Sequence, residues 1–126
     1  MHKLTDFIQP ILTLHNQIRE AVVTACETAS LAEMSAIAKE EEGDTIYAID
    51  RISEELLVDY FSREIATHVP IVLIAEGLDS GELVLPLGTP AAEAQWRIIV
   101  DPIDGTRGLM YQKRSAWILT GVAPNK

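Results

Sequence analysis

The sequence predicts an α+β fold in which two N-terminal helices pack on a mainly antiparallel sheet. Apolar residues recur at helical spacing from Leu4 to about Ala38, and again from about Ala48 to Ala66. Short apolar runs bounded by turn residues, which are typical of β-strands, occupy the rest of the chain. Helices layered on a sheet bury the apolar faces of both kinds of element, so we expect one layered α/β unit.

Local signals place the ends of the two helices. Thr5 or Asp6 can cap the first helix, and Pro10 falls within its first turns, where proline is tolerated. Residues 39–44 form a charged, glycine-containing connector. The second helix should end before Pro70, because the residue that precedes a proline is disfavoured in the α conformation.

Four strands are expected after the helices. Ile71–Ala75 is a continuous apolar run, consistent with a strand that is buried on both faces, and Trp96–Val100 is typical of a second buried strand. Leu83–Leu87 is expected at the edge of the sheet, because Pro86 would cost a central strand one hydrogen bond. Ser115–Ala123 is the last predicted strand.

Composition excludes several classes of protein. The 126 residues carry a formal net charge of −9, and Lys113-Arg114 is the only adjacent basic pair, so nucleic acid is not an expected partner. The N-terminus lacks a secretion signal, and no apolar run approaches the ~18 residues of a membrane span. We therefore expect a cytoplasmic protein with no membrane association. The single cysteine, Cys26, cannot form an internal disulfide.

Acidic residues follow two of the predicted strands. Ile71–Ala75 runs into Glu76, and Trp96–Val100 runs into Asp101. If the two strands are neighbours, their carboxylates would point into one crevice, which is a common ligand position in sheet proteins.

A second acidic residue follows Asp101 closely. A four-residue turn with Pro102 in its second position would bring Asp101 and Asp104 within ~7 Å of each other. Two carboxylates that close require a proton or a cation between them, and a hard divalent ion with oxygen ligands would meet that need. The carbonyl of Ile103 would be a further oxygen ligand. On local turn chemistry alone, an ordinary capped turn explains these residues equally well.

The two residues after this acidic pair suit a phosphate group. Gly105 permits a close approach of the backbone, and the N–H groups of Gly105 and Thr106 could hold phosphate oxygens. The Thr106 hydroxyl could also orient a water molecule.

These segments resemble a known family. Residues 96–106, Trp-Arg-Ile-Ile-Val-Asp-Pro-Ile-Asp-Gly-Thr, are similar to the metal-site signature of the inositol monophosphatases, which are magnesium-dependent phosphatases of the lithium-sensitive type. Residues 44–54 resemble the family segment that carries an aspartate, here Asp50, before a helix, and Lys39 stands at the spacing of the family's loop lysine. Ile74–Gly77 is similar to the family's Gly-Glu-Glu strand end. The resemblance covers most of the chain and implies a layered αβ sandwich of the sugar-phosphatase type.

The resemblance implies a ligand set for Mg²⁺. Glu76, Asp101 and the Ile103 carbonyl would bind a first ion, and Asp101 and Asp104 would bind a second. Asp104, Gly105 and Thr106 would bind the substrate, and Gly105 and Thr106 would contact its phosphate.

The resemblance also implies catalytic roles. Thr106, with Asp50 behind it, would orient and help to deprotonate the attacking water, and Glu76 would take part in catalysis through the first ion. Lys39 and Arg107 would belong to the outer shell of the site. The implied reaction is direct hydrolysis of a small phosphate monoester, such as an inositol, sugar or nucleotide phosphate, by water. A homodimer is compatible with the resemblance, because members of the family are often dimers.

Three departures from the family pattern are visible. Ala75-Glu76-Gly77 lacks the second glutamate, and Arg107 follows Thr106 where the family often has asparagine. Family members are about twice as long, so we expect residues 1–126 to be the N-terminal part of such a domain, truncated before the C-terminal half.

Other interpretations are weaker or belong to another class. A haloacid-dehalogenase-like phosphatase separates its two aspartates by one residue, whereas two residues lie between Asp101 and Asp104. A nucleotide hydrolase would need a glycine-rich phosphate loop with lysine, which is missing. The main alternative is a non-catalytic half-domain that binds metal weakly or pairs with another chain.

Overall fold

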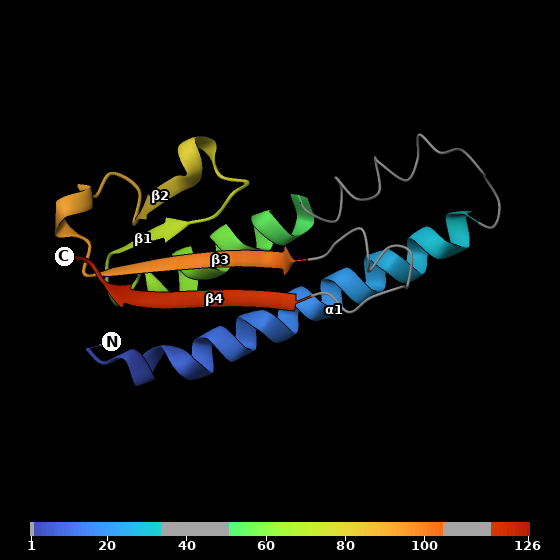
Figure 1. Ribbon diagram of the computed structural model, residues 1–126, viewed down its shortest axis with the longest axis horizontal. Helices are drawn as coiled ribbons and strands as arrows, with labels where there is room; N and C mark the ends of the chain where they lie inside the picture. Colours follow the sequence, from blue (N-terminus) through green and yellow to red (C-terminus); the bar gives the residue numbers. More distant parts are fainter. Residues whose placement is uncertain (1, 34–50, 105–116) are drawn as a thin grey trace.

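The computed structural model describes residues 2–33, 51–104 and 117–126 and consists of a helical layer and a sheet (Figure 1). A 3-10 turn, η1 (Leu4–Phe7), leads into α1 (Ile8–Glu33). The second helix is described from residue 51 and continues into a π-helical turn, η2 (Phe61–Ile65). Both predicted helices are confirmed over these residues. The predicted connector 39–44 lies outside the described residues.

The sheet has four strands in the order β2-β1-β3-β4. They are β1 (Ile71–Ile74), β2 (Glu82–Leu85), β3 (Trp96–Asp104) and β4 (Trp117–Pro124). β1 and β3 run parallel, whereas β1–β2 and β3–β4 are antiparallel, which confirms a mainly antiparallel sheet. β2 lies at an edge, as expected, and ends immediately before Pro86. Two short 3-10 turns, η3 (Asp79–Gly81) and η4 (Ala91–Glu93), flank β2.

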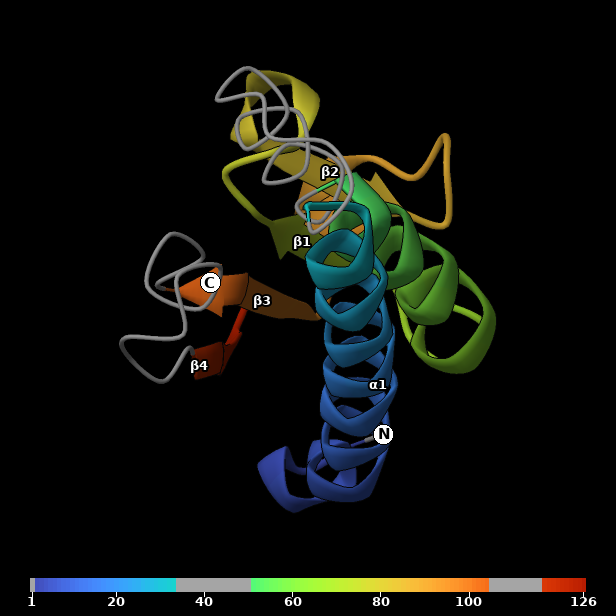
Figure 2. The same ribbon diagram turned by 90° about the vertical axis from the view of Figure 1, so that its right-hand side faces the viewer.

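Both helices lie on the same face of the sheet (Figure 2). Their apolar stripes meet the inward-facing residues of β1 and β3, and the largest side chains in this layer are fully buried. They are Phe7, Leu14, Ile18, Leu57, Phe61, Ile65, Ile71, Leu73 and Ile98. Phe7 and Trp96 add an edge-to-face contact with ring centroids 5.0 Å apart.

The prediction that Trp96–Val100 is a buried strand is only half correct. Ile98 and Val100 are buried, but Arg97 and Ile99 are exposed, and Ile99 keeps 56% of its accessible surface. Successive side chains of a strand point to opposite faces, and the two helices that the structure describes cover one of these faces. By contrast, β1 is buried on both faces over Ile71–Leu73, as predicted.

The predicted four-residue turn at Asp101–Asp104 is wrong. These residues extend β3, and β4 pairs with them: Asp101 lies opposite Leu119 and Asp104 opposite Trp117. Three steps along β3 match two steps along β4, so the strand contains one extra residue, which defines a β-bulge. Pairing with β4 supplies the backbone hydrogen bonds that an isolated turn would have made internally.

Two side-chain hydrogen bonds join the elements. The hydroxyl of Tyr60, on the second helix, donates to the Pro10 carbonyl of α1 at 2.7 Å. His15 Nε2 lies 2.8 Å from Thr120 Oγ1 and links α1 to β4. Among the described helices, none is long and apolar enough to cross a membrane.

Candidate functional site

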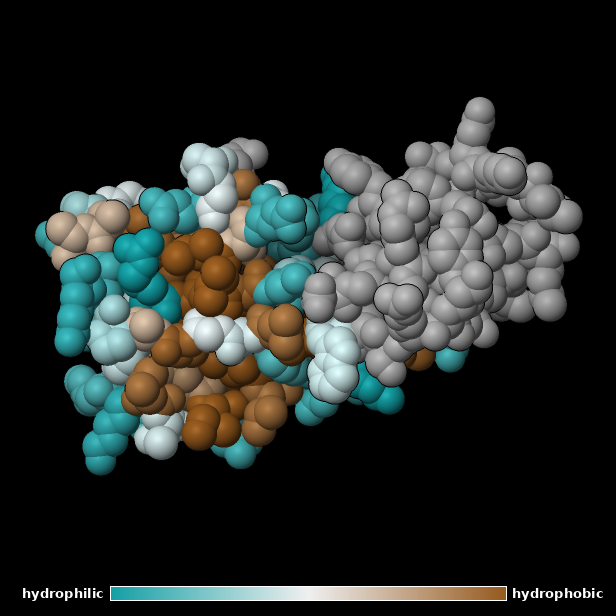
Figure 3. Space-filling view, in the orientation of Figure 1, coloured by the Kyte–Doolittle hydropathy of each residue, from teal (hydrophilic) through white to brown (hydrophobic). Residues whose placement is uncertain are grey.

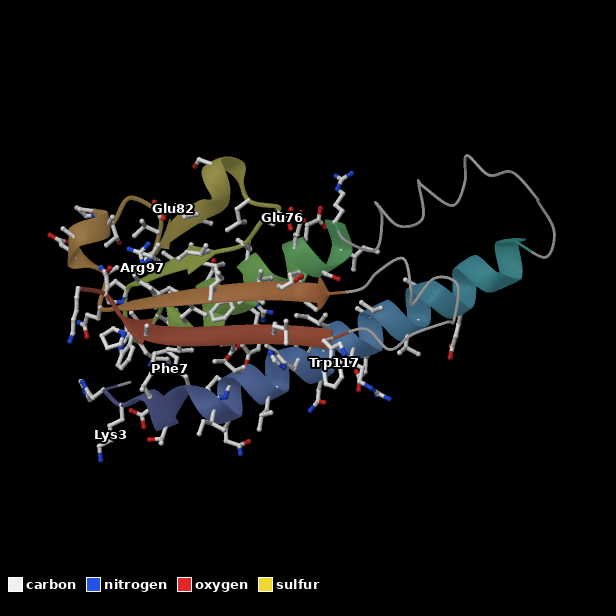
Figure 4. All side chains as sticks on the ribbon, in the orientation of Figure 1. Lys3, Phe7, Glu76, Glu82, Arg97 and Trp117 are labelled. Carbon is white, nitrogen blue, oxygen red and sulfur yellow. The ribbon has the colours of Figure 1, made fainter. Side chains whose placement is uncertain are left out.

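β1 and β3 lie side by side and run in the same direction. They pair from Ile71–Trp96 to Ile74–Ile99, and β3 continues five residues beyond Ile99 to Asp104. Glu76 lies in the turn two residues after the last residue of β1 (Figure 4), and Asp101 follows Ile99 by two residues within β3, so both come beyond the last pair of β1 with β3. Both residues are exposed. The expected adjacency of the two strands is therefore confirmed.

Local backbone hydrogen bonds hold the segment that carries Glu76. Ala75 N–H donates to the Gly81 carbonyl at 3.1 Å, and Leu78 N–H donates to the Ala75 carbonyl at 3.2 Å. Ser80 and Gly81 adopt positive φ values of 55° and 82°, which turn the chain back toward β2. Glu76 therefore stands at the second position of a turn that the Ala75–Leu78 hydrogen bond closes.

A third carboxylate approaches this strand end from the second helix. The carboxylate of Glu54 occupies the space that a Cβ atom on Gly77 would need, so any side chain at position 77 would collide with it. Gly77 is the position at which the family pattern has its second glutamate. The structure therefore places the Glu54 carboxylate, which comes from the second helix, beside the backbone of Gly77, where this chain has no second glutamate.

Sequence reasoning assigned no role to Glu54. The available signal was its spacing: Glu54 follows Asp50 by four residues, so the two share one face if the helix extends to residue 50. Glu54 also lines an open depression of about 490 Å³ on the second helix, together with Glu55, Val58, Asp59 and Ser62. An ion pair between Arg63 and Asp59, with an N–O distance of 2.7 Å, lies beside it.

The bulge determines how the two aspartate positions of β3 pair with β4. Asp101 lies opposite Leu119 and Asp104 opposite Trp117, which are two residues apart on β4. The sequence prediction connected Asp101 and Asp104 by a turn, whereas the structure connects them by a strand with one extra residue.

The other predicted site residues lie outside the described residues. They are Lys39, Asp50, Gly105, Thr106 and Arg107. Ile103 and Asp104 are described only as part of the β3 backbone. Within residues 2–33, 51–104 and 117–126, no three His, Cys, Asp or Glu side chains converge closely enough to hold a metal ion. The roles assigned to these residues therefore stay predictions.

Comparison with solved structures defines the fold. The extragenic suppressor protein SuhB from Bartonella henselae matches with a TM-score of 0.65 and 15% identity, over 95% of this chain and 40% of that protein. Inositol monophosphatase II from Staphylococcus aureus MSSA476 matches with a TM-score of 0.57 and 18% identity, over 95% of this chain and 38% of that enzyme. The chain thus spans about two fifths of the length of these proteins. None of the curated proteins compared with it matches significantly.

The family follows from the sequence profile. The inositol monophosphatase family profile matches residues 5–126, which is almost the entire chain. This chain belongs to the inositol monophosphatase family. The resemblance seen in the acidic motif, and the α+β fold it implied, are confirmed.

Proposed function

We propose that this chain provides the metal- and phosphate-binding part of a phosphatase that hydrolyses a small phosphate monoester with the help of Mg²⁺. The observation that carries the proposal is that Glu76 and Asp101 both come two residues after the last pair of two adjacent parallel strands. The family match over residues 5–126 supports the same reaction class.

The donor chemistry fits a hard divalent cation. Glu76 and Asp101 are exposed carboxylates on neighbouring strand ends, and two like charges held in one region favour the uptake of a cation. Carboxylate and carbonyl oxygens are the ligands that Mg²⁺ prefers. Glu76, Asp101, Asp104 and the Ile103 carbonyl would hold it. When bound, divalent ions stabilise the negative charge that develops on the attacking and leaving oxygens of phosphoryl transfer.

The chain's own residues would position the reactants. The Thr106 hydroxyl, hydrogen-bonded to Asp50, would orient the attacking water and pass its proton to the Asp50 carboxylate. The N–H groups of Gly105 and Thr106 would donate to the phosphate oxygens, next to Asp104. Lys39 and Arg107 would add positive charge around the phosphate. The monoester would be hydrolysed directly by water.

The family match supports a small phosphate monoester as the substrate. An inositol, sugar or nucleotide phosphate would present one phosphate to the acidic strand ends and its hydroxyl groups to the surroundings. A homodimer is the assembly we propose for the functional protein.

Turnover by the purified chain tests the proposal directly. Release of phosphate from inositol phosphate and from p-nitrophenyl phosphate should require Mg²⁺ and should be abolished by Asp101→Asn. The control is Glu93→Gln, an exposed carboxylate on η4 at a different part of the molecule, which should leave turnover unchanged. Normal turnover by folded Asp101→Asn protein would refute the assignment.

The length of this chain relative to the two matched structures favours a second candidate function. Because the chain spans about two fifths of its structural neighbours, it could act as a non-catalytic half-domain that binds metal weakly or pairs with another chain. Folded protein without Mg²⁺-dependent phosphate release would support this second function.

A further inference from the structure

The side chain of Glu54, and not the backbone, explains the glycine at position 77. Among the described glycines, Gly81 and Gly88 have positive φ values, of 82° and 88°, whereas Gly77 does not. The atoms nearest to a Cβ atom built on Gly77 are Oε1, Cδ and Oε2 of Glu54. A residue with a side chain would therefore suit the backbone at position 77, but it would displace the Glu54 carboxylate.

The second helix determines where the Glu54 carboxylate lies. Ser53 and Leu57 of this helix are fully buried, so the core fixes the rotation of the helix. Glu54 is partly buried at the margin of that contact. Glu55, the next residue, is exposed and forms an ion pair with Arg51 at 3.2 Å. Of these two glutamates, only Glu54 is placed by the core against the segment that follows β1.

The contact falls one residue after Glu76, inside a short turn. The ends of the turn are anchored, because Ala75 is buried and Leu78 packs against the core. The two middle residues, Glu76 and Gly77, are exposed. Figure 3 shows hydrophilic residues at the place where Figure 4 labels Glu76 in the same orientation. A side chain packed beside Gly77 therefore restricts the direction in which the exposed Glu76 can point.

We propose that Glu54 is a positioning residue for Glu76. Its carboxylate occupies the space beside Gly77, limits the conformations of the turn and so orients the Glu76 carboxylate toward the cation. Within residues 2–33, 51–104 and 117–126, no three acidic side chains converge on one point, so Glu54 acts through Glu76 and is not assigned as a ligand. The inference rests on the proposed function, in which Glu76 binds Mg²⁺.

Positioning of this kind should appear in metal affinity. A ligand that is already oriented before the cation binds loses less conformational freedom on binding. Residues that orient metal ligands typically contribute 10–100-fold to affinity in other proteins. Because the contact is made by one flexible side chain, we expect an effect at the lower end of that range, about tenfold.

Titration of the purified chain with Mn²⁺, followed by the electron paramagnetic resonance signal of the free ion, measures this effect. Glu54→Ala should weaken binding about tenfold. Glu54→Gln keeps the length and the acceptor oxygen of the side chain and should retain most of the affinity. Glu55→Ala removes the same charge from the neighbouring residue and should change nothing. Equal losses in Glu54→Gln and Glu54→Ala protein would overturn the inference, because charge and not position would then matter.

A double-mutant cycle in metal affinity separates positioning from a general effect on the fold. Gly77→Ala displaces the Glu54 carboxylate and should also weaken Mn²⁺ binding. In Glu54→Ala protein the same change should cause little further loss, because no carboxylate remains to be displaced. Glu55→Ala is the matched partner and should leave the effect of Gly77→Ala unchanged. Independent losses at positions 54 and 77, in protein that urea unfolding shows to be folded, would contradict the positioning role.

Glu76→Gln in the same titration distinguishes failure of this inference from failure of the proposed function. If Glu76→Gln weakens Mn²⁺ binding and Glu54→Ala does not, Glu76 remains a ligand and Glu54 has no positioning role. If the unaltered chain binds no Mn²⁺, or if Glu76→Gln leaves binding intact, the metal assignment in the proposed function is wrong and this inference fails with it. Losses in both variants, with affinity retained in Glu54→Gln, support it.

Discussion

His15 Nε2 lies 2.8 Å from Thr120 Oγ1, and this hydrogen bond joins α1 to the outer strand β4. β4 pairs with β3 alone among the described strands, and its helix-side residues Ile118, Thr120 and Val122 are only partly buried. A polar contact therefore contributes more to holding β4 on the helical layer than it would in a strand with a fully buried face.

This contact predicts a pH-dependent stability. Burial lowers the pKa of His15, so its folded-state pKa lies below the ordinary value of 6.5. The unfolded chain therefore binds the proton more readily than the folded chain. Stability should be complete above about pH 6.5 and should decrease as the pH falls from there through the lower folded-state pKa.

Urea unfolding at several pH values between about 5 and 7.5 tests this expectation. His15→Gln should remove the decrease that belongs to this residue, and loss of the hydrogen bond should cost about 0.5–1.5 kcal/mol above pH 7. His68→Gln, at an exposed position after η2, is the control and should retain the pH dependence. An unchanged pH profile in His15→Gln protein would exclude the proposed cause.

Ile98 and Ile99 on β3 test whether the helices cover one face of the sheet and leave the other exposed. Ile98 is fully buried against the helices, and Ile98→Ala should lower the free energy of unfolding by about 2–5 kcal/mol. Ile99 faces away from them, and Ile99→Ala should cost less than about 1 kcal/mol, mainly through the weaker strand preference of alanine. The midpoints of urea unfolding, compared at a constant m-value, measure the loss of stability in both variants. Equal losses at the two positions would mean that the second face is covered in solution.

Glu54 and Gly77 should behave as a coupled pair. Gly77→Ala forces the Glu54 carboxylate, the far end of a flexible side chain, to move aside, so it should destabilise the chain by less than about 1 kcal/mol. Glu54→Ala in the same protein should relieve that loss, with a coupling energy of about 0.5 kcal/mol in a double-mutant cycle. Glu55, exposed on the helix surface and paired with Arg51, is the control partner, and Glu55→Ala should be additive with Gly77→Ala. Additivity at Glu54 as well would contradict the contact.

Measurements of metal affinity test the role of Glu76 and Asp101 as ligands without requiring catalytic turnover. Glu76→Gln and Asp101→Asn should each weaken binding of Mg²⁺, or of Mn²⁺ as a spectroscopic substitute, by at least about 10–100-fold. Both side chains are exposed, so thermal unfolding should change little. Glu93→Gln, at an exposed carboxylate on η4 before the start of β3, is the control. Isothermal titration of the three variants would refute the assignment if all lost affinity equally, or if none did.

The helices and strands were predictable because their signals are local. The apolar spacing over Leu4–Val22 indicates a helix whatever it packs against, and Pro86 marks the end of an edge strand by removing one hydrogen-bond donor. The parallel pairing of β1 with β3 was not readable, because it depends on where β2 turns back. Once that pairing is known, the relation between Glu76 and Asp101 follows from counting residues.

Two features escaped sequence reasoning for a physical reason. Ile98 and Ile99 have the same side chain, and only the position of the helices decides which one is buried. Pro102 suits the second position of a turn, but it also fits a bulged strand, and the choice depends on β4, which is more than ten residues away in the sequence. Local chemistry gave the wrong backbone route between the two acidic residues, and their role as ligands stays a prediction.

The bulge in β3 makes pairing with β4 sensitive to residue number more than to residue type. Three steps along β3 match two steps along β4 between the pairs Asp101–Leu119 and Asp104–Trp117, so one residue there is surplus to regular pairing. Inserting or deleting a residue in the regular part of β3 would instead shift every later pair by one position and exchange the two faces of the strand beyond that point. A protein engineered from this scaffold should therefore change its length only at the bulge.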